Sequence, residues 1–311
     1  MTEYGNKLLV VLDGSERSFK TIEYLCDFKP FNRKDIVLFN VFNSVPESYW
    51  DISNEDFSRN AMSQAKGWEL QRRKEMEAYM ERAKSLLVSA GYLSTGISVC
   101  IKNRKKGVAR DIIAEASKGY FAVLARRRGY GALLHVVMGS TTTKLVENLS
   151  SVPVLLAGLQ KINNSIFLTV DGSEGSNRAV DFTANVVADS NCRIVLCSVL
   201  RDFEDFNLSG EGENAATSEY VKSFFNTMQS AIDDAAEKLK AAGIDSERIQ
   251  RKIITGTKTR AGSIATAAEE EGCDTIVLGR RGKSNVAEFG IGRVPWKVIH
   301  AARKMTVWIV S

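Results

Sequence analysis

Two short motifs hold the residues whose types and spacing could do chemistry, and each motif occurs twice. An apolar run ends in Asp-Gly-Ser at 13–15, and a similar run ends in Asp-Gly-Ser at 171–173. Leu-Ala-Arg-Arg-Arg-Gly at 124–129 is echoed by Leu-Gly-Arg-Arg-Gly at 278–282. A carboxylate at a strand end can accept hydrogen bonds from sugar hydroxyls, and closely spaced glycines let backbone N–H groups face an anion. The repeat predicts two similar units, each with one candidate site.

Glycines occur within the second motif and again after it, at a similar spacing in both halves. The residues in question are Gly129, Gly139, Ser140 and Thr141 in the first half, and Gly279, Gly282, Gly292 and Arg293 in the second. Gly139 and Gly292 each precede a predicted helix, whose first N–H groups are unpaired and lie at the positive end of the helix dipole. Ser140 and Thr141 add hydroxyl groups. Together with Asp13 or Asp171, these features predict a phosphate cradle facing an aspartate that suits a ribose.

Alternating apolar and amphipathic segments predict the elements that position these motifs. Strands are predicted at 7–12, 35–42, 97–101, 120–125, 152–157, 165–170, 193–199, 249–254, 274–279 and 305–310. Helices are predicted at 15–28, 65–90, 108–117, 140–148, 174–189, 217–242, 260–271 and 293–302, with irregular segments at 43–67 and 201–216.

The order of these elements predicts an α/β fold of two tandem doubly wound domains, residues 1–158 and 163–311. Each domain is expected to be a five-stranded parallel sheet with helices on both faces. Ligands of such sheets bind beyond the carboxyl ends of the strands. The aspartate and the glycine loop of each half should therefore lie on the same rim.

This combination of motifs resembles the universal stress protein family over essentially the whole chain. The family's nucleotide motif is Gly, two residues, Gly, nine residues, Gly, then Ser or Thr, and an aspartate ends its first strand; Asp13 and Asp171 match that aspartate. The resemblance implies binding of ATP, with Mg²⁺, or of a related adenine nucleotide, with adenine against the backbone near Val41 or Val199. It also implies that strands 152–157 and 305–310 pair within the chain as a pseudo-dimer. A further homodimer and an unknown protein partner are left open.

Both halves depart from the family motif. The first half has Ala125 or Arg126 where the leading glycine belongs, together with one extra loop residue. The second half has Arg293 in place of Ser or Thr, and Pro295 removes one N–H near the helix start. The first site is preferred because its helix start is intact.

Simpler interpretations stand beside these. Asp-Gly-Ser after a strand is also a turn followed by a helix N-cap. The arginines at 126–128 and 280–281 either attract phosphates or form solvated loops. The leading hypothesis is a stress-response protein that binds a nucleotide and acts through conformation or partner binding, and that is not an enzyme beyond slow ATP turnover. The alternatives are a scaffold with both pockets degenerate and a slow ATP-hydrolysing or adenylating enzyme, against which the Asp-Gly-Ser-Glu sequence of the first strand counts.

Composition, charge and cysteine spacing limit the classes of protein to which this chain can belong. The net charge of +5 on 311 residues does not indicate a nucleic-acid binder, and no apolar stretch is long enough to cross a bilayer. The N-terminus lacks the apolar core of a signal peptide, so we expect a cytoplasmic protein without membrane partners. The five cysteines show no CxxC spacing and stand far from both histidines in sequence. We therefore expect buried free thiols, no metal site and no catalytic histidine.

Overall fold

The computed structural model describes residues 5–44, 56–127, 138–201, 215–257, 259–282 and 290–311. The first half contains β1 (Lys7–Val11), α1 (Glu16–Asp27), η1 (Lys29–Arg33), β2 (Asp35–Phe42), α2 (Asp56–Ser89), β3 (Ile97–Asn103), α3 (Val108–Ala116), β4 (Ala122–Arg126), α4 (Ser140–Asn148) and β5 (Val154–Ala157). The second half contains β6 (Ser165–Thr169), α5 (Glu174–Val187), β7 (Arg193–Arg201), α6 (Ala215–Ala241), β8 (Ile249–Thr257), α7 (Arg260–Glu270), β9 (Thr275–Gly279), α8 (Arg293–Ala301) and β10 (Thr306–Val310). Every predicted strand and helix is present in the described part of the chain.

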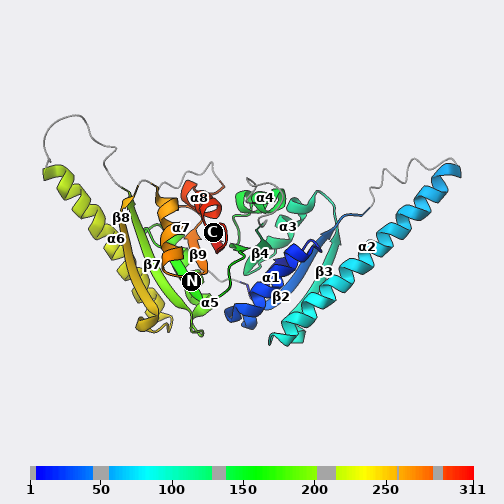
Figure 1. Ribbon diagram of the computed structural model, residues 1–311, viewed down its shortest axis with the longest axis horizontal. Helices are drawn as coiled ribbons and strands as arrows, with labels where there is room; N and C mark the ends of the chain where they lie inside the picture. The colour runs from blue at the N-terminus through cyan, green and yellow to red at the C-terminus, as the bar shows by residue number, and fades with distance from the viewer. Residues whose placement is uncertain (1–4, 45–55, 128–137, 202–214, 258, 283–289) are drawn as a thin grey trace.

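The strands form a single ten-stranded sheet in the order β3-β2-β1-β4-β5-β10-β9-β6-β7-β8. All pairs within each half are parallel, and the halves join through the antiparallel pair β5–β10. Figure 1 shows α2 and α6 at the two ends of the molecule and α4 and α8 close together at its middle. The tandem α/β fold and the intrachain pseudo-dimer predicted from the sequence are confirmed.

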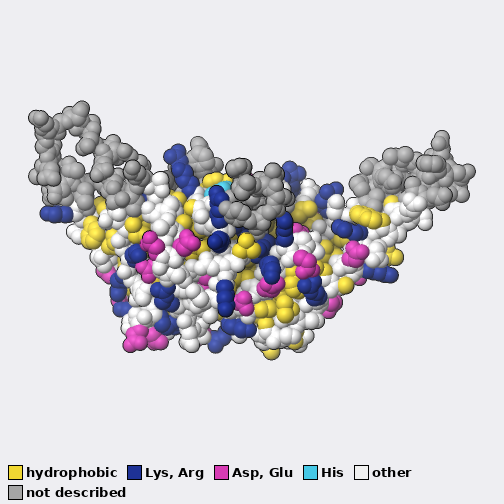
Figure 2. Space-filling view, in the orientation of Figure 1, with side chains coloured by type: hydrophobic (Ala, Val, Ile, Leu, Met, Phe, Trp, Pro, Cys, Tyr) yellow, Lys and Arg dark blue, Asp and Glu magenta, His cyan; other side chains and the backbone are white. Residues whose placement is uncertain are grey.

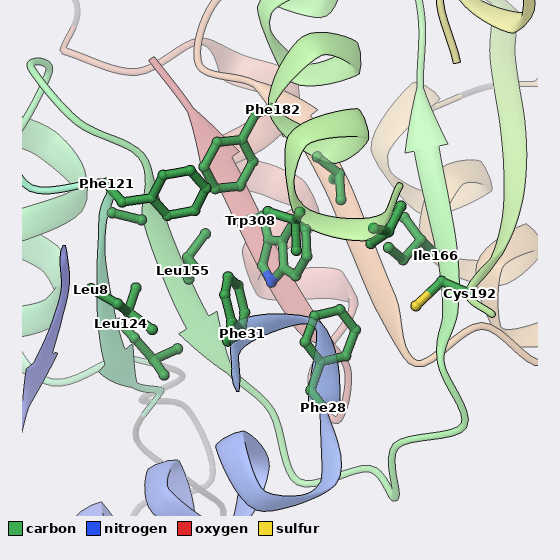
Figure 3. Packing of buried hydrophobic residues seen from close by; sticks show 14 of the residues in the cluster. Leu8, Phe28, Phe31, Phe121, Leu124, Leu155, Ile166, Phe182, Cys192 and Trp308 are labelled. Carbon is green, nitrogen blue, oxygen red and sulfur yellow. The ribbon is translucent and has the colours of Figure 1, made fainter. Parts of the chain in front are cut away.

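Aromatic side chains fill the seam between the halves. Trp308 of β10 is fully buried and lies 5.5 Å from Phe28, 5.7 Å from Phe31 and 5.8 Å from Phe182, measured between ring centroids. Its indole Nε1 donates to Tyr24 Oη at 3.3 Å. Figure 3 shows the Trp308 ring between phenylalanines from both halves. Because these rings exclude water from the strand junction, the halves share one hydrophobic core.

The linker between the halves is held by a buried carboxylate. Asp274 Oδ2 accepts hydrogen bonds from Asn163 N at 2.7 Å and Ser165 N at 3.2 Å, and Oδ1 accepts from Thr275 Oγ1 at 2.5 Å. Asp274 is fully buried, and this burial raises its pKa despite those hydrogen bonds. The linker is thus fixed against β9 rather than being a loose tether.

The structure corrects one boundary. The sequence predicts an irregular segment at 43–67, but α2 already begins at Asp56. The residues before 65 are mostly polar and lack the apolar periodicity that marks a packed helix face, so the pattern gave no signal. Most of the segment predicted as irregular at 201–216 lies outside the described residues.

Candidate functional site

Each Asp-Gly-Ser forms a turn that caps the helix following it. Ser15 Oγ accepts from Ser18 N at 3.1 Å, and Ser173 Oγ accepts from Ser176 N at 3.2 Å. The glycine of each motif has a positive φ, +83° at position 14 and +74° at position 172, which favours Gly. The turn-and-cap interpretation therefore accounts for the glycine and the serine of both motifs. It accounts for only one of the two carboxylate oxygens of each aspartate.

One carboxylate oxygen of each aspartate holds this turn. Asp13 Oδ1 accepts from Ser15 N at 2.9 Å and Ser15 Oγ at 2.6 Å, and Asp171 Oδ1 accepts from Ser173 N at 2.9 Å. Partial burial opposes ionisation of Asp13, but the hydrogen bonds from Ser15 outweigh it and lower the pKa. Asp13 is therefore a carboxylate at neutral pH, able to accept a hydrogen bond from a hydroxyl.

Helix α2 lies against the first Asp-Gly-Ser turn. Tyr79 Oη is 2.7 Å from Ser18 Oγ and donates to Ser15 O at 3.2 Å. A Cβ atom on Gly14 would lie 2.6 Å from Met76 Cε. Burial raises the pKa of Tyr79 to about 12, so its hydroxyl stays protonated. The position of Asp13 is thus tied to a helix that the sequence motif does not include.

In the second half, the aspartate and the glycine loop lie on the same rim, as predicted. A Cβ atom on Gly282 would lie 2.7 Å from Asp171 Oδ2, so the carboxylate lies against the backbone of this loop. We call residues 279–282 the second glycine loop. Gly279 has a different role, because a Cβ there would lie 2.8 Å from Ser176 N and closer still to the backbone of Gly175. It allows the strand end to pack against the first turn of α5.

Strand register identifies the residue that replaces the leading glycine in the first half. Leu8 and Ile166 each stand five residues before the aspartate of their Asp-Gly-Ser motif, and they pair with Ala122 of β4 and Thr275 of β9. Arg126 stands four residues beyond Ala122, and Gly279 stands four residues beyond Thr275.

Arg126 therefore stands where Gly279 stands, and Gly129 corresponds to Gly282. Because the spacing between the two positions is then the same in both halves, the predicted extra loop residue is wrong. We call residues 126–129 the first glycine loop; Gly129 itself lies outside the described residues. The close pair Gly175–Gly279 becomes Arg17–Arg126 in the first half. This paired exchange is visible in the repeat, but the motif comparison missed it because Gly175 lies outside the motif.

The helix starts beyond the glycine loops are uncapped by side chains. Gly139 and Gly292 are the N-caps of α4 and α8, and neither receives a side-chain capping bond. In α4 the first intrahelical bond runs from Thr143 N to Gly139 O at 2.9 Å, so the N–H groups of residues 140–142 precede it. Thr142 Oγ1 donates to Arg126 O at 3.2 Å, which joins this helix start to the first glycine loop.

The start of α8 is poorer in donors and more strongly charged. Pro295 occupies the position of Thr142 and supplies no N–H, and Gly292 N already donates to Arg280 O at 2.9 Å. Arg293 is exposed on the first turn, where Ser140 stands in the first half. Ser140 is likewise exposed, and Thr141 is partly buried. The two helix starts thus differ in the number of N–H groups that they carry, because Pro295 has none, and in their charge.

Val41 of β2 and Val199 of β7 each lie two residues beyond the last residue of their strand that pairs with β1 or β6. The last pairings of those strands are Val11 with Phe39 and Thr169 with Cys197. Alternate residues of a strand direct their N–H and C=O groups to the same neighbour, so Val41 and Val199 direct theirs beyond the ended strand. Both valine side chains are buried. The adenine position at these two valines stays a prediction.

Two residues of the arginine clusters, Arg127 and Arg280, fit neither interpretation drawn from the sequence. Arg127 and Arg280 are each 3% exposed, so neither is a solvated loop residue or a surface phosphate contact. Arg280 donates to Leu149 O at the end of α4, and Arg127 donates to Ala302 O at the end of α8. Burial lowers the pKa of both guanidinium groups to about 10, which leaves them charged at neutral pH.

These arginines therefore tie the halves together, with each holding the carbonyl end of a helix in the other half. Arg126 is half-buried and donates to Gly158 O at 2.8 Å. Outside the seam, positive and negative side chains are interspersed on the face shown in Figure 2.

Other candidate chemistry has no assembled site in the described residues. No group of three or more His, Cys, Asp or Glu side chains in that part of the chain could hold a metal ion. All five cysteines are free, and burial raises the pKa of each thiol. His300 Nδ1 lies 2.8 Å from Trp296 O within α8, and His135 is outside the described residues. Within the described ranges, no helix is long and apolar enough to span a membrane.

Comparison with known proteins agrees with this geometry. Residues 163–311 match the Universal stress protein family. A universal stress protein of Mycolicibacterium smegmatis is 29% identical over 130 residues, a match that covers 40% of this chain and only 44% of that relative. The crystal structure of a universal stress protein from Archaeoglobus fulgidus has a TM-score of 0.61 at 21% identity and covers 98% of both chains. A universal stress protein solved in complex with cAMP covers 47% of this chain and 96% of its own length, at 26% identity and a TM-score of 0.35.

The second half matches the family by sequence, and the first half repeats its strand order, its Asp-Gly-Ser turn and its uncapped helix start. The full-length structural similarity extends over both halves. Residues 163–311 thus match the universal stress protein family by sequence, and the whole chain has the tandem fold of a solved universal stress protein.

Proposed function

We propose that this chain binds ATP or a related adenine nucleotide in at least one of its two sites, and acts in a stress response through conformation or partner binding. The ribose would bind the aspartate, and the phosphates would bind the glycine loop and the uncapped helix start. The adenine would bind the strand end at Val41 or Val199. Mg²⁺ would accompany the phosphates.

The observation that carries this proposal is the contact between Asp171 and the second glycine loop. Asp171 Oδ2 faces the backbone of Gly282, while Oδ1 is occupied by the turn. A carboxylate oxygen and glycine backbone therefore border the same space. This pairing suits a ligand that carries hydroxyl groups beside an anionic group.

The contrast between capped and uncapped helices supports the same proposal. Helices α1 and α5 begin with a serine that satisfies an N–H group, whereas α4 and α8 begin with glycine and have no side-chain cap. Unsatisfied amides at a helix start are partners for an anion. We prefer the first site, because α4 keeps three leading amides and the hydroxyls of Ser140 and Thr141.

Titration calorimetry with ATP, with and without Mg²⁺, tests binding directly. AMP, cAMP and GTP belong in the same series, since they separate recognition of the base from recognition of the phosphates. Mass spectrometry of the freshly purified protein, after denaturation, would identify a ligand carried from the cell. Absence of heat with every nucleotide, in protein shown to be free of ligand, would refute the proposal.

A nucleotide-independent scaffold is the second candidate, and the arginines favour it. Arg126 stands at the leading glycine position of the first loop, and Arg293 stands at the start of α8. If these side chains fill both sites, the titration above stays flat while the protein remains folded. Slow hydrolysis is the third candidate, and release of radiolabelled phosphate from ATP separates it from binding alone.

A further inference from the structure

Arg280 joins the second glycine loop to the helix of the first site. Its Nη1 donates to Val146 O at 2.6 Å and to Gly290 O at 2.8 Å, and its Nη2 donates to Leu149 O. Its Nε donates to Ser311 Oγ at 3.0 Å. Val146 and Leu149 belong to the last turn and the C-cap of α4. The buried Arg280 guanidinium thus binds carbonyl groups at the C-terminal end of α4, and the N-terminal end of the same helix belongs to the first candidate phosphate site.

A second contact holds the same turn. A Cβ atom on Gly290 would lie 3.0 Å from the carbonyl carbon of Glu147 and would overlap its oxygen, so the second half packs backbone to backbone against α4. Helix α4 has nine residues and is about 13 Å long. A helix this short moves as one body, so a contact that fixes its last turn also fixes the direction of its first N–H groups.

The reciprocal contact has fewer hydrogen bonds among the described residues. Arg127 donates from Nη1 to Ala302 O at the end of α8, while its Nε and Nη2 have no hydrogen-bond partner in the part of the chain that the structure describes. The counterpart of Ser311, which binds Arg280 Nε, is Gly158. A side chain cannot be added there, because a Cβ would lie 2.6 Å from Met305 O. Among the described residues the seam is therefore asymmetric, and more of its hydrogen bonds run from the second half to α4.

We infer that Arg280 is a positioning residue for the first site: it orients α4 from the second half and thereby sets nucleotide affinity in the first half. This inference rests on the proposed function. It predicts that the two sites are energetically coupled through Arg280. It also gives the duplicated fold a use, since neither half alone holds its helix in this way.

The test compares Arg280→Met with Arg178→Met. Arg178 is a matched control, since its Nε donates to Ser311 O at 2.9 Å and it bonds Glu174, yet none of these contacts reaches α4. Hydrogen exchange of ligand-free protein should rise about tenfold for residues 140–149 in Arg280→Met and remain unchanged in Arg178→Met. ATP affinity at the first site, followed by ATP-dependent protection of the same residues, should fall about 3- to 30-fold in Arg280→Met only.

Three outcomes decide the matter. If Arg280 only adds stability, Arg280→Met would lower Tm but leave the dissociation constant of the folded protein unchanged at temperatures well below Tm. That result would overturn the inference. Should Arg280→Met fail to fold, Arg280→Lys retains the charge but loses the branched contacts, and wild-type affinity in that variant would also overturn it. If the wild type binds no ATP, the proposed function fails; the inferred control of affinity fails with it, while the exchange measurement still decides whether Arg280 positions α4.

Discussion

The two candidate sites are built from the same elements but have lost different parts of the family motif. The second site keeps its leading glycine, and its aspartate touches the glycine loop, but its helix start carries Pro295 and Arg293. The first site keeps an open helix start but has Arg126 at the leading position.

The leading glycine is required for packing of the strand end against α5, whereas the helix start supplies N–H groups that could bind a ligand. Gly279 is needed because the backbone of α5 lies against it, and Gly175 is its partner. The first half replaces both glycines with arginines and shows the same fold. Losing the leading glycine therefore says less about nucleotide binding than losing a helix-start amide does. The predictions below test this distinction.

The largest effect is expected from Gly279→Val. A Cβ at this position would lie 2.8 Å from Ser176 N and closer still to Gly175, so α5 would have to move, at a cost of about 3 kcal/mol or more. Urea denaturation measures the loss. Arg126→Val at the equivalent position is the control and should cost about 1 kcal/mol, for one hydrogen bond. Equal costs at the two positions would show that the glycine is not a packing requirement.

Asp13→Ala is expected to weaken ATP binding at the first site by about 1–3 kcal/mol, because a charged acceptor for ribose is lost. Calorimetry with ATP and with its 2′,3′-dideoxy analogue measures the effect. The variant should bind the two nucleotides equally, whereas the wild type should prefer ATP. A wild type that does not discriminate between them would remove the ribose role. Asp171→Ala repeats the test in the second half.

Acid should destabilise the first half through Glu115, which has no acidic counterpart at the equivalent Ala268. Burial opposes ionisation of Glu115, but hydrogen bonds from Lys102, Lys118 and Tyr120 outweigh it and lower its pKa to about 2. The unfolded value is 4.5, so this stabilisation is complete above about pH 4.5 and is lost as the pH falls toward 2.

Glu115→Gln should therefore cost about 1–2 kcal/mol at pH 7, after allowance for screening of the half-exposed lysines, and almost nothing at pH 2. Urea melts across this range measure the difference. In the second half, the more exposed Glu271 pairs with Lys252, which lowers the pKa of Glu271. Glu271→Gln is the matched control and should cost less at pH 7. A cost for Glu115→Gln that does not change with pH would contradict the assignment.

The smallest effect is a gain. Arg293→Ser combined with Pro295→Thr copies the start of α4 onto α8 and restores one N–H group. We expect about fivefold tighter ATP binding at the second site, the value of roughly one hydrogen bond. Calorimetry in an Asp13→Ala background isolates that site. Unchanged affinity would mean that the helix start does not limit binding there.

Most of the fold was predictable because its signals are local. Strand ends such as Val11 and Thr169 follow from apolar runs that stop at Asp-Gly-Ser, and helix starts follow from serine caps. The start of α2 at Asp56 was not predictable, because a helix that extends beyond the core needs no apolar face. At the site, the sequence placed both aspartates, and the contact between Asp171 and Gly282 agrees with their predicted shared rim.

The sequence by itself determined the repeat, the order of its elements and the edge of the sheet where a ligand would bind, since these depend on residue types close together in the chain. Only the tertiary structure decided that Arg126 is the counterpart of Gly279, because that depends on hydrogen-bond register between separated strands. Only the tertiary structure could show that Arg127 and Arg280 are buried in the seam. Three arginines in a row look alike in sequence, and the packing of the other half determines which are withdrawn from water.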